Sequence, residues 1–73
     1  MTRTAKEIET ALNLVNFTNA SKFETEMEAI NAGVALCSSN ADIETFSTKT
    51  MDDKYIVGVA RYSARHYLIG FIG

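Results

Sequence analysis

Residues 54–62 read Lys54-Tyr55-Ile56-Val57-Gly58-Val59-Ala60-Arg61-Tyr62, a run rich in β-branched and aromatic residues. Such a composition favours a β-strand, and turn-forming residues bound it on both sides: Asp52-Asp53 before it and Ser63-Ala64-Arg65 after it. We therefore predict a central strand over residues 54–62. It would belong to an antiparallel meander whose other two strands cover residues 42–51 and 66–72.

The first forty residues carry helical spacing instead. Thr4 and Glu7 form a capping-box pattern, and it precedes the apolar stripe Ile8, Ala11, Leu12 and Val15. Ser21 and Glu24 repeat that pattern before a second stripe, Phe23, Met27, Ile30, Val34 and Cys37. The predicted fold class is therefore α+β: two N-terminal helices followed by a three-stranded antiparallel β-meander, in a single domain over residues 1–73.

Length and composition exclude several classes of protein. The chain has 73 residues, a net charge of −2 and one cysteine, which excludes a two-domain enzyme and an internal disulfide scaffold. No apolar run approaches the ~18 residues of a membrane span, and the first residues lack the apolar core of a secretion signal. We expect a cytoplasmic protein. If the chain comes from a virus, the expected location is the cytoplasm of the host cell.

Alternation along the strands sorts the predicted sheet into two faces. If the hairpins turn at Asp52-Asp53 and at Ala64, one face carries the bulky residues and forms the core under the second helix: Phe46, Tyr55, Val57, Val59, Tyr67, Ile69 and Phe71. The other face mixes apolar with small polar residues and includes Ile56, Tyr62, Leu68 and Ile72. Two readings stay open: this face is an exposed binding surface, or the first helix crosses over and covers it.

The last predicted strand is apolar on both sides over residues 67–72 and lies at an edge of a simple meander. An uncharged apolar edge promotes aggregation unless another strand pairs with it. Three solutions are open: the first strand curls round, the last strand is inserted centrally, or a second chain pairs with it. The third solution predicts a homodimer or the addition of a strand from a partner.

Residues that carry chemistry are sparse. His66 is the only histidine and Cys37 the only cysteine, and one of each cannot close a tetrahedral metal site. His66 lacks a nucleophile motif nearby, so a turn histidine is the favoured interpretation, and Cys37 fits a buried thiol on the helix stripe. We therefore expect no enzyme, no cofactor and no metal.

Charge offers two candidate surfaces. Glu24 and Glu28 lie one helical turn apart and would suit a basic groove on another protein, although such an acidic flank is usually only solvated. The cations Lys54, Arg61 and Arg65, with Tyr62 between them in sequence, would suit a single-stranded nucleic acid. Because the net charge is negative, solvated cations are the favoured reading of the second set.

The prediction for function is a small non-enzymatic protein-interaction module. By analogy of size and composition, it fits an inhibitor from a phage or mobile element that blocks a host protein by occupying its surface. The predicted partner is another protein or a second copy of this chain, through the C-terminal strand or the open sheet face. The predicted contact residues are Glu24, Glu28, Ile56, Tyr62, Leu68 and Ile72. The alternative is a single-stranded nucleic-acid-binding protein using Lys54, Arg61, Arg65 and Tyr62.

Overall fold

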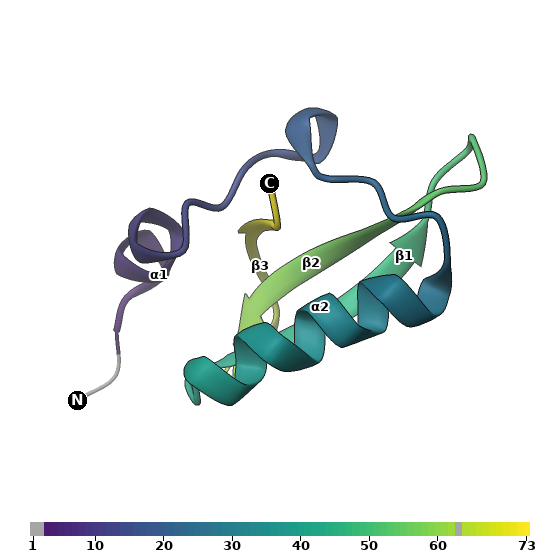
Figure 1. The fold of residues 1–73 in the computed structure, drawn as a ribbon. Coiled ribbons are helices and arrows are strands. Elements are labelled where there is room, and N and C mark those ends of the chain that lie inside the picture. The colour runs from purple at the N-terminus through teal and green to yellow at the C-terminus, as the bar shows by residue number, and fades with distance from the viewer. Residues whose placement is uncertain (1–2, 63) are drawn as a thin grey trace.

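The computed structural model describes residues 3–62 and 64–73, without the side chains of residues 64–66 (Figure 1). Two α-helices and a short 3-10 helix precede a single sheet of three antiparallel strands in the order β1-β2-β3. The elements are α1 (Ala5–Ala11), the 3-10 helix (Phe17–Asn19), α2 (Glu26–Ser39), β1 (Ile43–Lys49), β2 (Tyr55–Arg61) and β3 (Ala64–Phe71). The α+β arrangement of helices followed by an antiparallel meander is confirmed.

Helix α1 begins as predicted and ends early. Thr4 and Glu7 form the reciprocal capping box, and Ile8 is fully buried. The helix stops after seven residues, and Asn13 takes the left-handed conformation with a φ of 54°. Asparagine tolerates this conformation better than most residues, so the chain turns away here and Val15 lies outside the helix.

The segment of residues 15–23 runs beside the sheet. Val15 and Phe71 exchange backbone hydrogen bonds of 2.9 and 2.8 Å, and the Ser21 N–H donates to the Ile72 carbonyl at 2.9 Å. Phe23 and Tyr55 form a second such pair, at 2.7 and 2.9 Å. The C-terminal end of β3 is therefore paired within the chain. None of the three predicted solutions includes this pairing; the addition of a second chain to the rest of the strand stays a prediction.

This pairing also delays the start of α2. The predicted start at Ser21 is wrong, because the backbone of Phe23 is committed to Tyr55. The N-cap is Thr25, whose hydroxyl accepts from the Glu28 N–H while the Glu28 carboxylate accepts from the Thr25 N–H. The helix therefore follows the same capping rule, one helical turn later.

Helix α2 is rotated relative to the prediction. Its small residues Ala29 and Gly33 are buried against the sheet, whereas Met27, Ile30 and Val34 are 66%, 44% and 57% exposed. The reason is close approach: a Cβ added at Gly33 would lie 2.5 Å from Thr45 Oγ1. A helix with small residues on one side can lie closer to a sheet than one with large residues there, and this contact determines which side is buried.

The register of the first hairpin differs by one residue from the prediction. Thr45 lies opposite Val59 and Ser47 opposite Val57. The Thr50 N–H donates to the Lys54 carbonyl at 2.8 Å, which closes a loop of three residues, and Asp53 in that loop has a φ of 62°. A slip of one residue moves a whole strand to the other face, so β1 presents Ile43, Thr45 and Ser47 to α2, and Phe46 to the opposite side.

The second hairpin keeps the predicted register at one pair only, and Arg61 lies opposite Ala64, so the predicted turn centred on Ala64 is wrong. Ala60 lies opposite Leu68 as expected, but an irregularity between Val59 and Ala60 places Phe71, in place of Gly70, opposite Gly58. Phe71 therefore shares the face of Ile56, away from α2.

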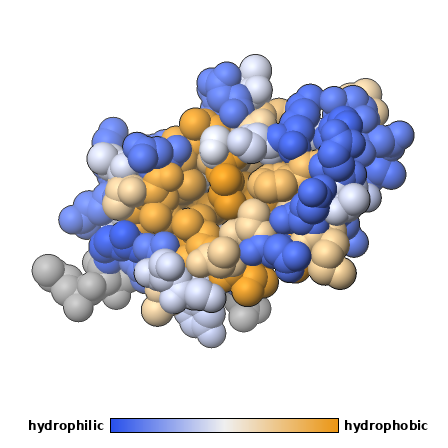
Figure 2. All heavy atoms as spheres, in the orientation of Figure 1, coloured by the Kyte–Doolittle hydropathy of each residue, from blue (hydrophilic) through white to orange (hydrophobic). Residues whose placement is uncertain are grey.

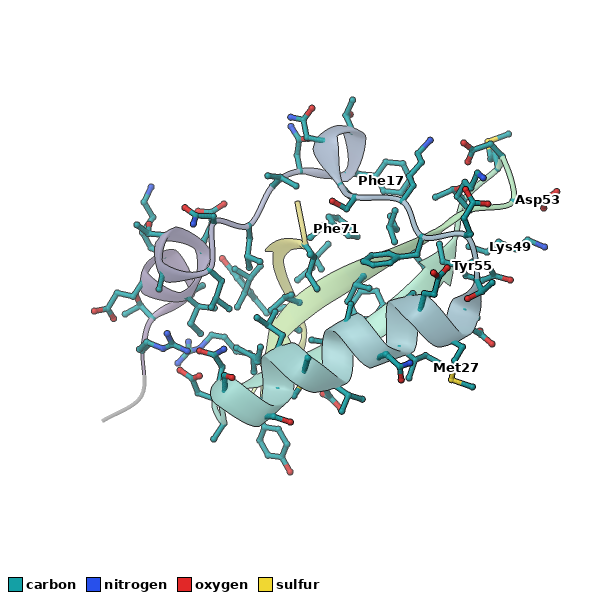
Figure 3. The ribbon with its side chains drawn as sticks, viewed as in Figure 1. Phe17, Met27, Lys49, Asp53, Tyr55 and Phe71 are labelled. Carbon is teal, nitrogen blue, oxygen red and sulfur yellow. The ribbon has the colours of Figure 1, made fainter. Side chains whose placement is uncertain are left out.

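Two clusters form the core, one on each face. Beneath the helices, the buried residues are Ile8, Leu14, Ile43 and Val59. On the far face, Ala20, Ile56 and Phe71 pack together with Val15, and the exposed ring of Phe17 meets Phe71 edge to face at 5.7 Å (Figure 3). Of the two open readings, neither describes the far face: α1 lies on the same face as α2, and residues 15–20 cover part of the other one.

Candidate interaction surface

An open apolar groove lies between α1 and α2. It has a volume of about 480 Å³ and is lined by Leu12, Asn13, Leu14, Ala32, Ala35, Leu36, Ile72 and Gly73. Figure 2 shows hydrophobic atoms gathered in the middle of this face with hydrophilic atoms around them. We call this feature the interhelical groove.

The groove exists because α1 is short and does not pack along α2. In the structure α1 ends at Ala11, and Leu12 and Leu14 form only the opposite wall. The side chain of Ile72 completes the lining from the end of the sheet. Apolar side chains of both walls therefore remain accessible.

A second apolar surface lies on the other flank of α2. It consists of Met27, Ile30 and Val34, which we call the α2 stripe, and Figure 3 shows Met27 projecting away from the sheet. Beneath the stripe, a smaller pocket of about 110 Å³ lies between α2 and β1. Its lining is Ala29, Ile30, Gly33, Val34, Thr45, Phe46, Ser47 and Val57.

The four apolar or aromatic residues of the predicted contact set do not form one surface. Ile56 is fully buried under residues 15–20, and Ile72 is half-buried in the wall of the interhelical groove. Tyr62 and Leu68 are 61% and 46% exposed, near the other end of β2. Ile56 lies on the face predicted for it, but it is separated from Tyr62 and Leu68 because residues 15–20 cover its part of that face.

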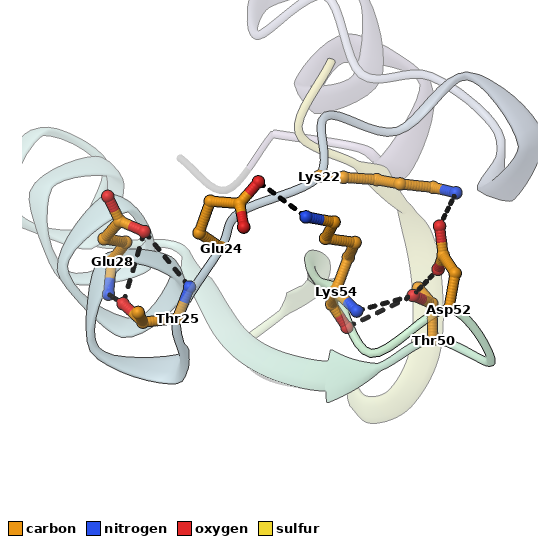
Figure 4. A network of polar contacts seen from close by, with 7 residues as sticks. All are labelled: Lys22, Glu24, Thr25, Glu28, Thr50, Asp52 and Lys54. Carbon is orange, nitrogen blue, oxygen red and sulfur yellow. Dashed lines mark hydrogen bonds and ion pairs between the residues drawn. The ribbon is translucent and has the colours of Figure 1, made fainter.

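The two acidic residues of the predicted set are exposed and already engaged within the chain (Figure 4). Glu24 accepts from Lys54 Nζ at 2.6 Å, and the hydrogen bond raises the pKa of Lys54. Glu28 is the capping-box residue of Thr25. Nearby, Lys22 Nζ and an Asp52 carboxylate oxygen are 2.8 Å apart. These ion pairs join the residues just before α2 to the β1–β2 hairpin, so Glu24 contributes to contacts within the chain.

The cations of the alternative surface lie far apart where they are described. Lys54 precedes β2 and Arg61 ends it, a separation of roughly 20 Å along a strand. Arg61 shares the face of Val59 and is half-buried, and its Nε has no hydrogen-bond partner among the described residues. Tyr62 is exposed beside it in sequence, and the side chains of Arg65 and His66 lie outside those that the structure describes.

Groups with catalytic or metal-binding chemistry are few. Within residues 3–62 and 64–73, apart from the side chains of 64–66, no three or more His, Cys, Asp or Glu residues gather as a metal site would require. The Sγ of Cys37 is half-buried, 3.5 Å from Thr45 Oγ1. In the same part of the chain, no helix has the length and apolar character to cross a membrane.

Of the residues that line the interhelical groove, only Ile72 was among the predicted contacts. Leu12 and Leu14 flank Asn13, so a break of the helix at this asparagine was a signal available in the sequence. Ala32 and Leu36 were visible as a second apolar side of α2. A comparison with protein-family models, curated proteins and solved structures found no match for this chain.

Proposed function

We propose that this chain is a non-catalytic protein-interaction module that binds another protein through the interhelical groove. The observation that carries the proposal is the apolar lining of a groove open to solvent between two helices. Exposed apolar areas of this kind on a small domain are typical of binding sites, because their burial against a partner is favourable. The part of the partner that inserts into the groove is then no longer free to make other contacts, and an inhibitor of this size would act in this way.

The walls define what fits. Ala32 and Ala35 are small, so they leave space along α2, while Leu12 and Leu36, which are half-buried, supply apolar contact area. A partner segment that presents a row of large apolar side chains, as an amphipathic helix does, would fill this space. The expected ligand is therefore an apolar helix or loop of another protein.

The test compares two neighbouring residues on opposite flanks of α2. Ala35 and Val34 are both exposed, but Ala35 lines the groove and Val34 belongs to the α2 stripe. We expect Ala35→Arg to fill the groove and abolish capture of a partner that the wild-type chain retains from its native host. Val34→Arg is the matched control and keeps that partner.

Mass spectrometry identifies the retained protein, and titration with the purified partner then gives the affinity of each variant. A partner held equally by wild type and Ala35→Arg contradicts the groove as the binding site. Circular dichroism of both variants shows that a loss of binding does not come from unfolding.

A further inference from the structure

Strand β1 has an open outer edge. Two backbone hydrogen bonds to the β2 side lie just beyond the two ends of β1. The Tyr62 N–H donates to the Asp42 carbonyl at 3.0 Å, and the Thr50 N–H donates to the Lys54 carbonyl at 2.8 Å. Backbone groups alternate in direction along an antiparallel strand, so the even-numbered residues of β1 face β2. The N–H and C=O groups of Thr45 and Ser47 therefore point away from the sheet, and no backbone partner for them exists among the described residues.

Apolar side chains flank this edge on both faces of the sheet. On one side lie Ile30 and Val34 of the α2 stripe, beside the pocket that reaches Thr45 and Ser47. On the other side lies Phe46, which is 46% exposed. An open edge with apolar flanks favours the addition of another strand, because both the backbone bonds and the side-chain burial then become available.

We propose that the occupant of this edge is a second copy of the chain, paired antiparallel through β1 about a two-fold axis at Phe46. In this register Thr45 of one copy lies opposite Ser47 of the other, and the groups that exchange hydrogen bonds are those left open in the single chain. The two sheets become one continuous sheet, and the two Phe46 side chains lie next to each other on its far face.

The position of α2 favours a copy of this chain over an unrelated strand. Helix α2 packs on both β1 and β2, so its axis lies above that pair of strands. With strands about 4.8 Å apart, the α2 helices of the two copies would lie roughly 10 Å apart, which is an ordinary distance between packed helices. An unrelated strand would pair with the edge but leave the α2 stripe uncovered, unless its own protein supplied a helix at the same spacing.

The alignment of α2 with β1 brings the two stripes together. Cys37 and Gly33 both contact Thr45, and Ala29 lines the pocket beside Ser47, so α2 runs antiparallel to β1 with its middle near Phe46. The two-fold axis then places Met27 of one copy near Val34 of the other. Lys49 falls opposite Ile43, whose neighbours Asp42 and Glu44 are acidic, so like charges do not meet across the pair.

Sedimentation of the full chain over a range of concentrations tests the proposal. We expect a reversible dimer, and Val34→Arg should raise its dissociation constant about 100-fold, because the symmetry introduces the charge into the apolar contact twice. Ala35→Arg, on the groove side of α2, should leave the dissociation constant unchanged. A wild-type chain that stays monomeric, or a dimer that Val34→Arg does not weaken, overturns the proposal.

A crosslink tests the axis itself. In a Cys37→Ser background, Phe46→Cys should oxidise rapidly to a covalent dimer, since the two positions face each other across the axis within disulfide range. Leu68→Cys is the control: Leu68 and Phe46 are both 46% exposed, and Leu68 lies on β3, away from the β1 edge. Equal crosslinking rates overturn the proposed register.

These outcomes are separate from those of the proposed function. A monomeric chain that still captures a partner through the groove refutes only the dimer. If the chain dimerises but captures no partner whose binding Ala35→Arg abolishes, only the proposed function of the groove is refuted.

Discussion

The ring of Phe46 lies against Gly58, its neighbour across β1 and β2: a Cβ added at Gly58 would stand 2.3 Å from Phe46 Cζ. Cβ atoms do not approach other atoms so closely, so the absence of a side chain at Gly58 is what allows the ring to cover the strand. Gly58 is buried as a result, although the ring above it is partly exposed.

Gly58→Ala should therefore destabilise the chain by about 1–3 kcal/mol, because the aromatic ring must leave the sheet. Urea unfolding of the single variants and of the double variant with Phe46→Ala measures this cost. In the Phe46→Ala background the cost of Gly58→Ala should largely disappear. An unchanged cost in that background would show that the ring is not the cause.

A second close contact predicts a loss of stability where helix propensity alone predicts a gain. Replacing glycine by alanine inside a helix is normally favourable by roughly 1 kcal/mol. At Gly33, however, the new methyl group meets Thr45 Oγ1 at 2.5 Å. We expect Gly33→Ala to destabilise the chain by about 1–2 kcal/mol, and to become nearly neutral in a Thr45→Ala background. Stabilisation by Gly33→Ala alone, in thermal or urea unfolding, would contradict this contact.

The cap of α2 gives a third prediction. Thr25→Ala removes the hydroxyl that accepts from the Glu28 N–H and should cost about 1 kcal/mol. Ser21→Ala is the matched control, because Ser21 donates to Ile72 through its backbone, which the substitution keeps. Its effect on the free energy of unfolding should stay within about 0.5 kcal/mol. The reverse order of the two effects would place the cap at Ser21.

The ion pair between Lys22 and Asp52 gives stability a dependence on pH. Hydrogen bonds from Lys22 and Thr50 lower the pKa of Asp52 from 3.8 to about 2. A carboxyl whose pKa is lowered by folding stabilises the fold at pH values above its pKa in the unfolded chain. This contribution is lost as the pH falls from 3.8 to about 2. The pKa values of Glu7 and Asp42 are also lowered, mainly by hydrogen bonds with Thr4 and Arg3 respectively, and act in the same direction.

Titration of the Asp52 carboxyl by NMR tests this origin. Lys22→Gln should raise the pKa of Asp52 toward 3.8, since Lys22 is the largest cause of the shift. Lys49→Gln is the control on the same hairpin, because Lys49 pairs with Asp53. It should leave the pKa of Asp52 unchanged. An equal effect of both substitutions would indicate a general effect of nearby positive charge in place of the specific pair.

What the sequence predicts well is local. The capping box at Thr4 and the order of helices and strands follow from patterns a few residues long. Features for which two equivalent patterns compete, such as the start of α2, are predicted poorly. Ser21 with Glu24 and Thr25 with Glu28 obey the same capping rule, and only the distant contact between Phe23 and Tyr55 decides between them.

The candidate surfaces were hidden for the same reason. Met27, Ile30 and Val34 have the composition of a buried stripe, and the contact of Gly33 with Thr45 turns them outward. That contact depends on the register of β1, and the register depends on a three-residue loop that contains Asp53. Asp53 has a left-handed conformation there, which an aspartate in the sequence indicates less clearly than a glycine would. A slip of one residue in a turn therefore changes which residues of the helix are available to a partner.

The backbone pairing of Val15 with Phe71 also constrains how the chain folds. The two residues are separated by most of the sequence, so this contact closes a long loop and has a large entropic cost before it forms. Helix α2 and the β1–β2 hairpin contain mainly short-range contacts and are expected to form early, whereas α1 and residues 15–21 attach only after β3 is in place. During synthesis, residues 5–21 therefore leave the ribosome before α2 and the sheet, yet reach their native position after them.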